Sequence, residues 1–253
     1  MTIKKHLPNL VTLLNLFCGS VAVIFAVHNN FIAAALFVFL GIFFDFFDGL
    51  LARKLNVQSP LGVQLDSLAD MVTSGLVPGI VMFKLMSIAV DTPLFFNATD
   101  EWNSELHWSG IGDSWLPLLG LLITLASAYR LAKFNIDEDQ QSYFKGLPTP
   151  ANALLIVSLP LIMEFQNNDL MNSMILNKWV LIVLTLVSCY LLNSNIKLFA
   201  LKFKDWSFKN NAVRYVFIIL TLVLIVLLQF AAIPVVILFY ILLSLLSKSL
   251  ISK

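Results

Sequence analysis

Long apolar segments recur along almost the whole chain and restrict the folds open to it. The chain has 253 residues, of which 59% are hydrophobic and only 12% are charged, whereas soluble domains carry about 25% charged residues. A membrane-spanning helix needs about 20 predominantly apolar residues. We therefore predict an all-α fold, a polytopic membrane helix bundle of about eight transmembrane helices, at residues 8–28, 31–52, 61–89, 115–135, 148–166, 178–195, 212–230 and 232–250.

Lysine and arginine are distributed unevenly between the two sides of this predicted bundle. With the N-terminus in the cytosol, 14 of the 16 basic residues fall on the inner side, and only Lys84 and Lys178 fall on the outer side. Short cytosolic loops of membrane proteins carry such an excess. We expect an integral protein of the cytoplasmic membrane, with both termini inside and the first apolar segment retained as a helix. The formal net charge of +1 gives no reason to expect nucleic acid as a partner.

Four aspartates interrupt the second and third apolar segments. Asp45 and Asp48 are three residues apart, and Asp66 and Asp70 are four apart, so each pair shares one helix face. In a helical hairpin, residues equally far from the turn lie at similar depth, which brings the two pairs together roughly 8–15 Å inside the cytosolic helix ends. Because ionised carboxylates are costly within a membrane, their convergence predicts a functional site on the cytosolic side.

The residue types in this cluster point to metal-assisted phosphate chemistry. Carboxylate oxygens without cysteine or histidine suit hard cations such as Mg²⁺, Mn²⁺ or Ca²⁺. Two such ions can clamp a diphosphate and offset the charge on a leaving phosphate. Gly49 and Ala52 leave room for a ligand close to the helix backbone, and Arg53 can bind phosphate through two donors.

The same residues carry a resemblance to a known family. Asp45, Asp48, Gly49, Ala52, Arg53, Gly62, Asp66 and Asp70 match every fixed position of D-x2-D-G-x2-A-R-x8-G-x3-D-x3-D. This pattern resembles the signature of the CDP-alcohol phosphotransferase family, also called CDP-alcohol phosphatidyltransferases. The resemblance implies a membrane-embedded homodimer with a six-helix catalytic core. We expect that core at residues 1–195, followed at 196–253 by a cytosolic Lys-rich loop and two additional transmembrane helices.

The resemblance also implies a role for each matching residue. Asp45, Asp48, Asp66 and Asp70 would hold two divalent ions, Mg²⁺ or Mn²⁺, and Asp70 would act as the general base on the attacking hydroxyl. The CDP-lipid would contact Asp45, Gly49, Ala52, Arg53 and Gly62. Asn9, Thr12 and Asn15 share one face of the first segment; they either contact the cytosine or bond to neighbouring helices.

Further motifs are similar to the bacterial phosphatidylserine synthases within this family. They are residues 66–70 followed by Ser74, Gly75 and Pro78, then 129–135 and 144–150. This similarity implies transfer of the phosphatidyl group of CDP-diacylglycerol to the hydroxyl of L-serine, giving phosphatidylserine and CMP. Arg130, Lys145 and Lys133 all fall on the cytosolic side, where they either bind the serine carboxylate or anchor the helices at the membrane surface.

Two alternatives remain open at this stage. The first is the same chemistry with another acceptor alcohol: glycerol 3-phosphate, inositol or choline. A phosphorylated acceptor needs a denser basic pocket than the sequence offers, which favours serine. The second is a divalent cation transporter that uses the aspartates as its ion path. The aspartates lie near one membrane face rather than at the midplane, and no pair of broken helices is evident, both of which disfavour transport.

Overall fold

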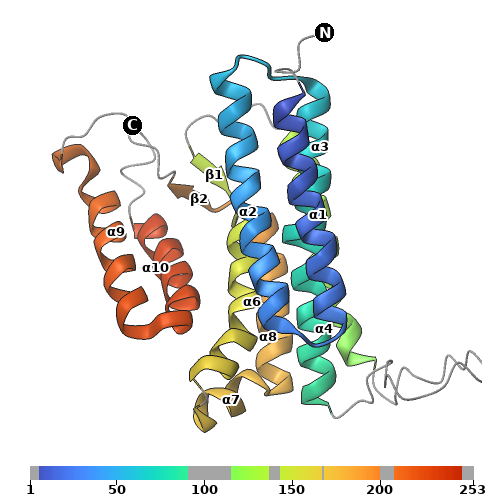
Figure 1. The fold of residues 1–253 in the computed structure, drawn as a ribbon. Coiled ribbons are helices and arrows are strands. Elements are labelled where there is room, and N and C mark those ends of the chain that lie inside the picture. Colours follow the sequence, from blue (N-terminus) through green and yellow to red (C-terminus); the bar gives the residue numbers. More distant parts are fainter. Residues whose placement is uncertain (1–5, 91–114, 137–142, 167, 200–207, 247–253) are drawn as a thin grey trace, which may run out of the picture.

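The computed structural model describes residues 6–90, 115–136, 143–166, 168–199 and 208–246. Helices make up nearly all of this part (Figure 1), which confirms the predicted all-α membrane bundle. The elements are α1 (Leu7–Val27), α2 (Phe31–Lys54), α3 (Pro60–Asp70), the π-helical segment η2 (Met71–Leu76), α4 (Val77–Ala89), the 3-10 segment η4 (Leu116–Leu121), α5 (Leu122–Ile136), β1 (Tyr143–Lys145), α6 (Thr149–Gln166), α7 (Asp169–Ile175), α8 (Lys178–Asn193), β2 (Lys197–Phe199), α9 (Phe208–Leu228), the 3-10 segment η5 (Gln229–Ala231) and α10 (Ala232–Leu246).

Each of the eight predicted segments contains a helix, but fewer are long and apolar enough to cross a membrane. In the described part of the chain, five segments meet that test by length and composition, and the bent pair α7 and α8 makes a sixth if it counts as one span. The segment Asn211–Leu246 passes as one unit, although α9 and α10 within it lie side by side and antiparallel (Figure 1). Gln229, whose φ is 48°, lies at the turn between them.

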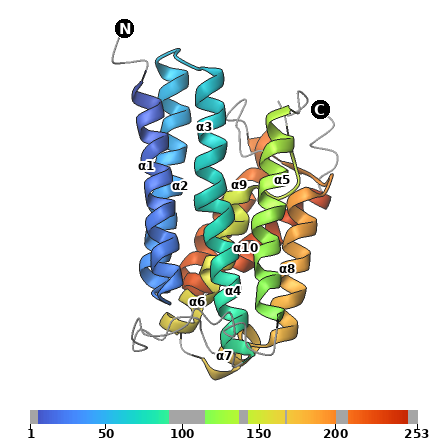
Figure 2. The ribbon, with the colours of Figure 1, turned by 90° about the vertical axis from the view of Figure 1, so that its right-hand side faces the viewer.

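Small residues allow the helices of the bundle to pack closely. α1 and α2 form a hairpin whose contact surface includes the fully buried Ala22, Ala26 and Ala34. Close approach through small side chains is typical of helices in membranes. The continuous run α3, η2 and α4 packs along α1, and α5 packs against α8 (Figure 2).

α6 lies at the centre of the bundle, where 11 of its 18 residues are buried. It contacts α2, α4, α8 and α10. Apolar side chains of the surrounding helices complete one continuous core around it, among them Val38, Met82, Ile156 and Leu181.

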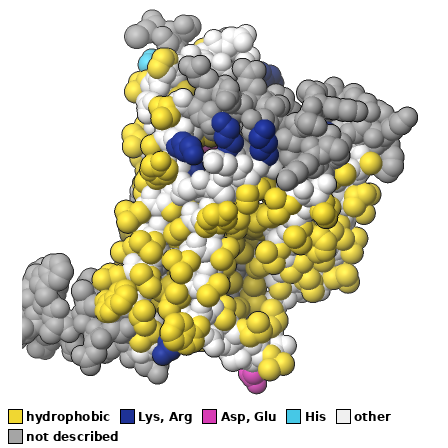
Figure 3. All heavy atoms as spheres, turned by 180° about the vertical axis from the view of Figure 1, so that it is seen from behind, with side chains coloured by type: hydrophobic (Ala, Val, Ile, Leu, Met, Phe, Trp, Pro, Cys, Tyr) yellow, Lys and Arg dark blue, Asp and Glu magenta, His cyan; other side chains and the backbone are white. Residues whose placement is uncertain are grey.

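The surface carries a broad apolar band, and Lys and Arg side chains gather toward the end at which the N-terminus lies (Figure 3). The band includes many exposed large side chains, for example Phe17, Leu125 and Val183. A surface of this kind fits a protein that is surrounded by lipid rather than by water.

Two short strands form a pair that the sequence analysis did not predict. β1 and β2 are antiparallel, with Lys145 opposite Lys197. The hydroxyl of Tyr240 on α10 donates to the carbonyl oxygen of Phe199 at 2.8 Å, and the rings of Phe199, Phe217 and Tyr240 pack together. This small ribbon therefore ties the α9 and α10 hairpin to the rest of the bundle.

Candidate active site

The turn between α2 and α3 is built so that the two helices run side by side. Asn56 adopts a left-handed backbone conformation with φ of 53°, and the N–H of Val57 donates to the carbonyl of Ala52 at 3.0 Å, which closes the end of α2. Ser59 begins α3 by accepting a hydrogen bond from the N–H of Gly62 at 3.0 Å, and Pro60 suits the first helical turn.

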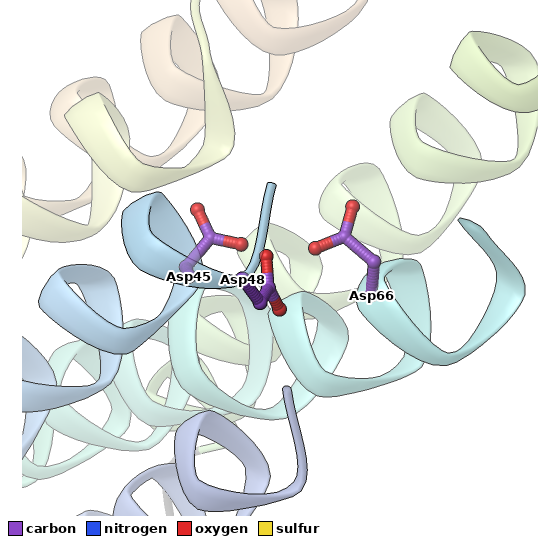
Figure 4. A group of neighbouring side chains, drawn as sticks. All are labelled: Asp45, Asp48 and Asp66. Atoms are coloured by element: carbon purple, nitrogen blue, oxygen red, sulfur yellow. The ribbon is translucent and has the colours of Figure 1, made fainter. Parts of the chain in front are cut away.

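This hairpin brings Asp45 and Asp48 of α2 against Asp66 of α3. One carboxylate oxygen from each of the three lies within 4.8 Å of the others, and Figure 4 shows the three side chains turned toward a common space. Asp48 is buried, and the hydroxyl of Thr12 on α1 donates a hydrogen bond to its Oδ2. We define the acidic cluster as Asp45, Asp48 and Asp66; α2 and α3 supply its carboxylates, and α1 supplies a hydrogen-bond donor to one of them.

Asp70 lies at the end of α3, one turn beyond Asp66. Its Oδ1 accepts a long hydrogen bond of 3.4 Å from Nδ2 of Asn15. It is close enough to all three members of the acidic cluster and to Arg130 to interact with their charges. The structure thus brings three of the four aspartates into one group and holds the fourth between that group and α5.

The acidic cluster fits a divalent cation by its donor chemistry. All donors are carboxylate oxygens, which hard cations prefer. Carboxylates this close repel one another in a partly buried setting unless a positive charge lies between them. The buried Asp48 in particular needs such compensation, because the side chain that donates a hydrogen bond to it is the neutral hydroxyl of Thr12.

A cavity of about 770 Å³ opens beside the cluster. It is large enough for a ligand of nucleotide size. Its walls come from α1, α2, the turn and α3: Pro8, Asn9, Thr12, Asp45, Phe46, Asp48, Gly49, Ala52, Arg53, Val57, Gln58, Ser59, Pro60, Gly62, Val63 and Asp66. Of the residues expected to contact a CDP-lipid, only Asn15 is missing from this lining, and Asp70 is missing too.

Two glycines border the cavity: Gly49 leaves open space beside α2, and Gly62 allows α3 to pack closely against α1. A Cβ on Gly49 would meet only Nη2 of Arg53, at 3.8 Å, so the space above Gly49 is open. A Cβ on Gly62 would lie 3.2 Å from Oγ of Ser59 and 3.3 Å from Oδ1 of Asn9. Nε of Arg53 donates to the carbonyl of Gly49 at 3.0 Å, which places the guanidinium along the cavity wall.

A comparison with protein-family models matches residues 5–191 to the CDP-alcohol phosphatidyltransferase family. The chain belongs to this family. The match covers the acidic cluster, the cavity and Asp70, so the geometry described above is that of a member of the family.

Curated relatives of this chain share names that refer to serine. The CDP-diacylglycerol–serine O-phosphatidyltransferase of Bacillus subtilis (strain 168) is 34% identical over 159 residues, which cover 61% of this chain and 75% of the relative. The protein of the same name from Helicobacter pylori (strain J99) is 29% identical over 59% of this chain and 55% of the relative. The archaetidylserine synthase of Methanothermobacter thermautotrophicus is 30% identical over 60% and 56%, respectively. The match thus spans only about half the length of the last two.

A second, small cavity of about 20 Å³ lies where α5, β1 and α8 meet. Arg130, Lys133 and Lys145 line it together with Phe134, Leu192, Asn193 and Ser194. The three basic residues predicted for acceptor binding therefore do come together. Gly146 makes this possible: its φ is +73°, and a Cβ there would lie 2.6 Å from the carbonyl oxygen of Leu192.

Several buried polar groups of η2, α5, α6 and α8 have no hydrogen-bond partner in the described residues. Both side-chain atoms of Asn152 are unpaired, and so is Nε of Arg130. Two hydrogen bonds connect α5, α6 and α8. The N–H of Leu147, just before α6, donates to the carbonyl of Leu191 on α8, and Nδ2 of Asn193 on α8 donates to the carbonyl of Ala126 on α5. We define the polar layer as the buried, unpaired Ser74, Ser127, Thr149, Asn152 and Ser188.

Sequence reasoning left some of these residues unassigned. Ser59 lines the large cavity, and its position before Pro60 is a helix N-cap signal that could have found it. The polar layer carried no such signal, because single serines and threonines in apolar segments usually bond to the preceding turn of their own helix.

Proposed function

We propose that this chain transfers the phosphatidyl group of CDP-diacylglycerol to the hydroxyl of L-serine and releases CMP. The observation that carries the proposal is the acidic cluster, three carboxylates within 4.8 Å of one another in the wall of a cavity of about 770 Å³. These residues lie within the part of the chain that matches the family. The choice of serine is supported by the names of the relatives.

The large cavity is proposed as the site of the CDP group. Arg53 and the amide of Asn9 face it as donors for phosphate and base, and the open space at Gly49 lets the diphosphate approach α2 closely. Ala52 and Gly62 also line the cavity with small residues that leave room for the ligand. Thr12 orients Asp48 by a hydrogen bond. Two divalent ions, Mg²⁺ or Mn²⁺, held by the acidic cluster with Asp70, would supply charge compensation for the diphosphate and for the departing CMP.

Asp70 is proposed as the general base. It takes the proton from the serine hydroxyl while the hydroxyl oxygen bonds to the phosphorus next to the lipid. The bond from that phosphorus to the oxygen of CMP breaks, and CMP leaves with the electron pair. The place of Asp70 at the edge of the acidic cluster, toward α5, supports this assignment.

The acceptor side of the site is proposed at Arg130, Lys145 and Lys133. Arg130 is buried, has an unpaired Nε and interacts with the charge of Asp70. A guanidinium in this position can bind the serine carboxylate and so bring the hydroxyl toward Asp70. The polar layer offers further neutral partners for a small polar substrate.

The wider organisation is also part of the proposal. The lysine and arginine distribution supports a place in the cytoplasmic membrane with the site and both termini in the cytosol. The family match ends at residue 191, which supports a catalytic core at 1–195 and an accessory part at 196–253. The homodimer follows from the family resemblance alone.

A direct assay tests this function. The purified full chain in detergent is given CDP-diacylglycerol, Mn²⁺ or Mg²⁺ and one acceptor at a time: L-serine, glycerol 3-phosphate, inositol or choline. We expect CMP release with L-serine only, and no release from the Asp66→Asn variant. Release with a different acceptor would overturn the serine assignment, and no release with any acceptor would overturn the reaction.

A further inference from the structure

Thr73 is a fully buried threonine whose hydroxyl faces another helix. It lies in the π-helical segment η2, three residues after Asp70. Its Oγ1 lies 2.8 Å from Oδ1 of Asn15 on α1 and 3.1 Å from the backbone carbonyl of Asn15. Asn15 is fully buried as well, and it does not line the large cavity. A contact with bound CDP therefore does not account for this pair.

The direction of the hydrogen bonds follows from the chemistry of the groups. An ionised Asp70 can only accept, so Asn15 must present its amide Nδ2 to it, as it does at 3.4 Å. Oδ1 of Asn15 then faces Thr73, whose hydroxyl must donate. The three groups thus have one consistent arrangement, which runs from Thr73 through Asn15 to Asp70.

Two glycines make room for this arrangement. A Cβ on Gly19 of α1 would lie 2.9 Å from the backbone N and Cα of Thr73. A Cβ on Gly41 of α2 would lie 2.6 Å from Cγ2 of Thr73 and 2.9 Å from Oδ1 of Asn15. Real Cβ atoms do not approach backbone this closely, so the backbone of α1 can lie against η2 only because residue 19 is glycine.

The π-helical geometry starts directly after Asp70. Such widened turns are rare and occur frequently at functional sites. Here the wide turn carries Thr73 into the space between α1 and α2, where it meets Asn15. Thr73 holds the amide of Asn15 in one orientation, and Asn15 in turn holds the carboxylate of Asp70. A carboxylate held in this way loses little conformational freedom during the reaction, which favours its action as a general base.

We propose that Asn15 and Thr73 are positioning residues that orient the carboxylate of Asp70, an inference that rests on the proposed function of Asp70 as the base. Asn15 contacts Asp70, and Thr73 fixes the amide orientation of Asn15. Neither residue is among those that line the large cavity. The 3.4 Å separation of Asn15 and Asp70 is long, as catalytic hydrogen bonds often are before substrate binds.

A matched pair of variants at residue 73 separates the hydroxyl from packing. Thr73→Val keeps the shape and removes the donor, whereas Thr73→Ser keeps the donor and removes the methyl group next to Gly41. We expect Thr73→Val to lower kcat roughly 10- to 100-fold with an unchanged KM for CDP-diacylglycerol, and Thr73→Ser to stay within about threefold of the wild type. Equal kcat losses in both variants, or none in Thr73→Val, would overturn the inference.

Infrared difference spectra give a readout that does not depend on turnover. The carboxylate stretch of Asp70, assigned by subtraction of the Asp70→Asn spectrum, should shift in Thr73→Val and stay in place in Thr73→Ser. An unshifted band in Thr73→Val would contradict the proposed positioning of Asp70 by Thr73 and Asn15, even if the wild type proved inactive with serine. If Thr73→Val does not fold, Asn15→Leu takes its place and should shift the same band; an unchanged band there would also contradict the inference.

Discussion

The hydroxyl of Thr12 on α1 donates a hydrogen bond to Oδ2 of Asp48 on α2, and both side chains are buried. Through this contact α1 supports the acidic cluster, although all three carboxylates of the cluster lie on α2 and α3. Partners of metal-binding carboxylates fix their orientation, and their loss typically costs about 10- to 100-fold in metal affinity. If the acidic cluster holds the proposed cation, loss of this contact should weaken cation binding.

Thr12→Val should raise the Mn²⁺ concentration that gives half-maximal CMP release by about 10-fold or more, because Asp48 loses the donor that orients it. Thr12→Ser keeps the hydroxyl and should behave like the wild type. The measurement is a Mn²⁺ titration at saturating serine and CDP-diacylglycerol. An unchanged titration for Thr12→Val would show that the cation does not depend on Asp48 being held in this way.

Gly49→Val should weaken binding of CDP-diacylglycerol without affecting the fold. The only side-chain atom near a Cβ at Gly49 is Nη2 of Arg53, at 3.8 Å, so the new side chain enters the large cavity. We expect a rise of about 10-fold or more in the KM for CDP-diacylglycerol, since a wrong shape in a pocket costs about 1–3 kcal/mol, and an unfolding temperature close to that of the wild type.

The matched control for this variant is Gly120→Ala. A Cβ there would lie 2.5 Å from the backbone N of Phe83, so this smaller substitution should lower the unfolding temperature although it is remote from the cavity. A stable Gly120→Ala together with an unfolded Gly49→Val would contradict the assignment of open space to Gly49.

Arg130→Met should raise the KM for serine at least 10-fold, with little change in the KM for CDP-diacylglycerol, because a charge-assisted hydrogen bond to the serine carboxylate contributes about 1.5–3 kcal/mol. Lys145→Ala should act in the same direction with a smaller effect. Lys54→Ala serves as the control, since Lys54 lines neither cavity. If the variants changed only the KM for CDP-diacylglycerol, these residues would belong to the CDP-lipid site, and their assignment to serine binding would be wrong.

Gly146→Ala should destabilise the protein by about 1–3 kcal/mol, because alanine is strained at a φ of +73° and its Cβ would press on the carbonyl oxygen of Leu192. Unfolding monitored in detergent measures this loss. Asn56→Gly is the opposite test: Asn56 already has a φ of 53°, so glycine there should be neutral or slightly favourable. Equal stability of the wild type and Gly146→Ala would show that the turn relaxes at no cost.

The hairpin and its acidic cluster could be predicted from the sequence because both depend on local rules. Helical spacing places Asp45 and Asp48 on one face, and the short turn after Arg53 sets the depth of Asp66 against them. The same reasoning placed Asp70 with the others; its charge does interact with those of Asp45, Asp48 and Asp66, although it is not among the three carboxylates that lie within 4.8 Å of one another. One turn along α3 moves a residue about 6 Å and rotates it by about 40°, which is enough to turn Asp70 toward Asn15 and α5.

Contacts between distant segments could not be predicted in this way. Thr73 and Asn15 are 58 residues apart, and their meeting depends on how η2 is rotated against α1, which apolar periodicity does not determine. The pairing of β1 with β2 was missed for a similar reason. Each strand has three residues, and such short segments carry too little pattern to be distinguished from a loop.

The central claim is that the carboxylates of the α2 and α3 hairpin divide binding and catalysis between them, with Asp70 as the base. The most direct measurement compares phosphatidylserine formation and CDP-diacylglycerol binding in the wild type and in Asp70→Asn, under the same conditions. We predict that Asp70→Asn forms no phosphatidylserine above background while its Kd for CDP-diacylglycerol stays within about threefold of the wild-type value. Substantial product formation by Asp70→Asn, or an equal loss of binding and turnover, would contradict the account.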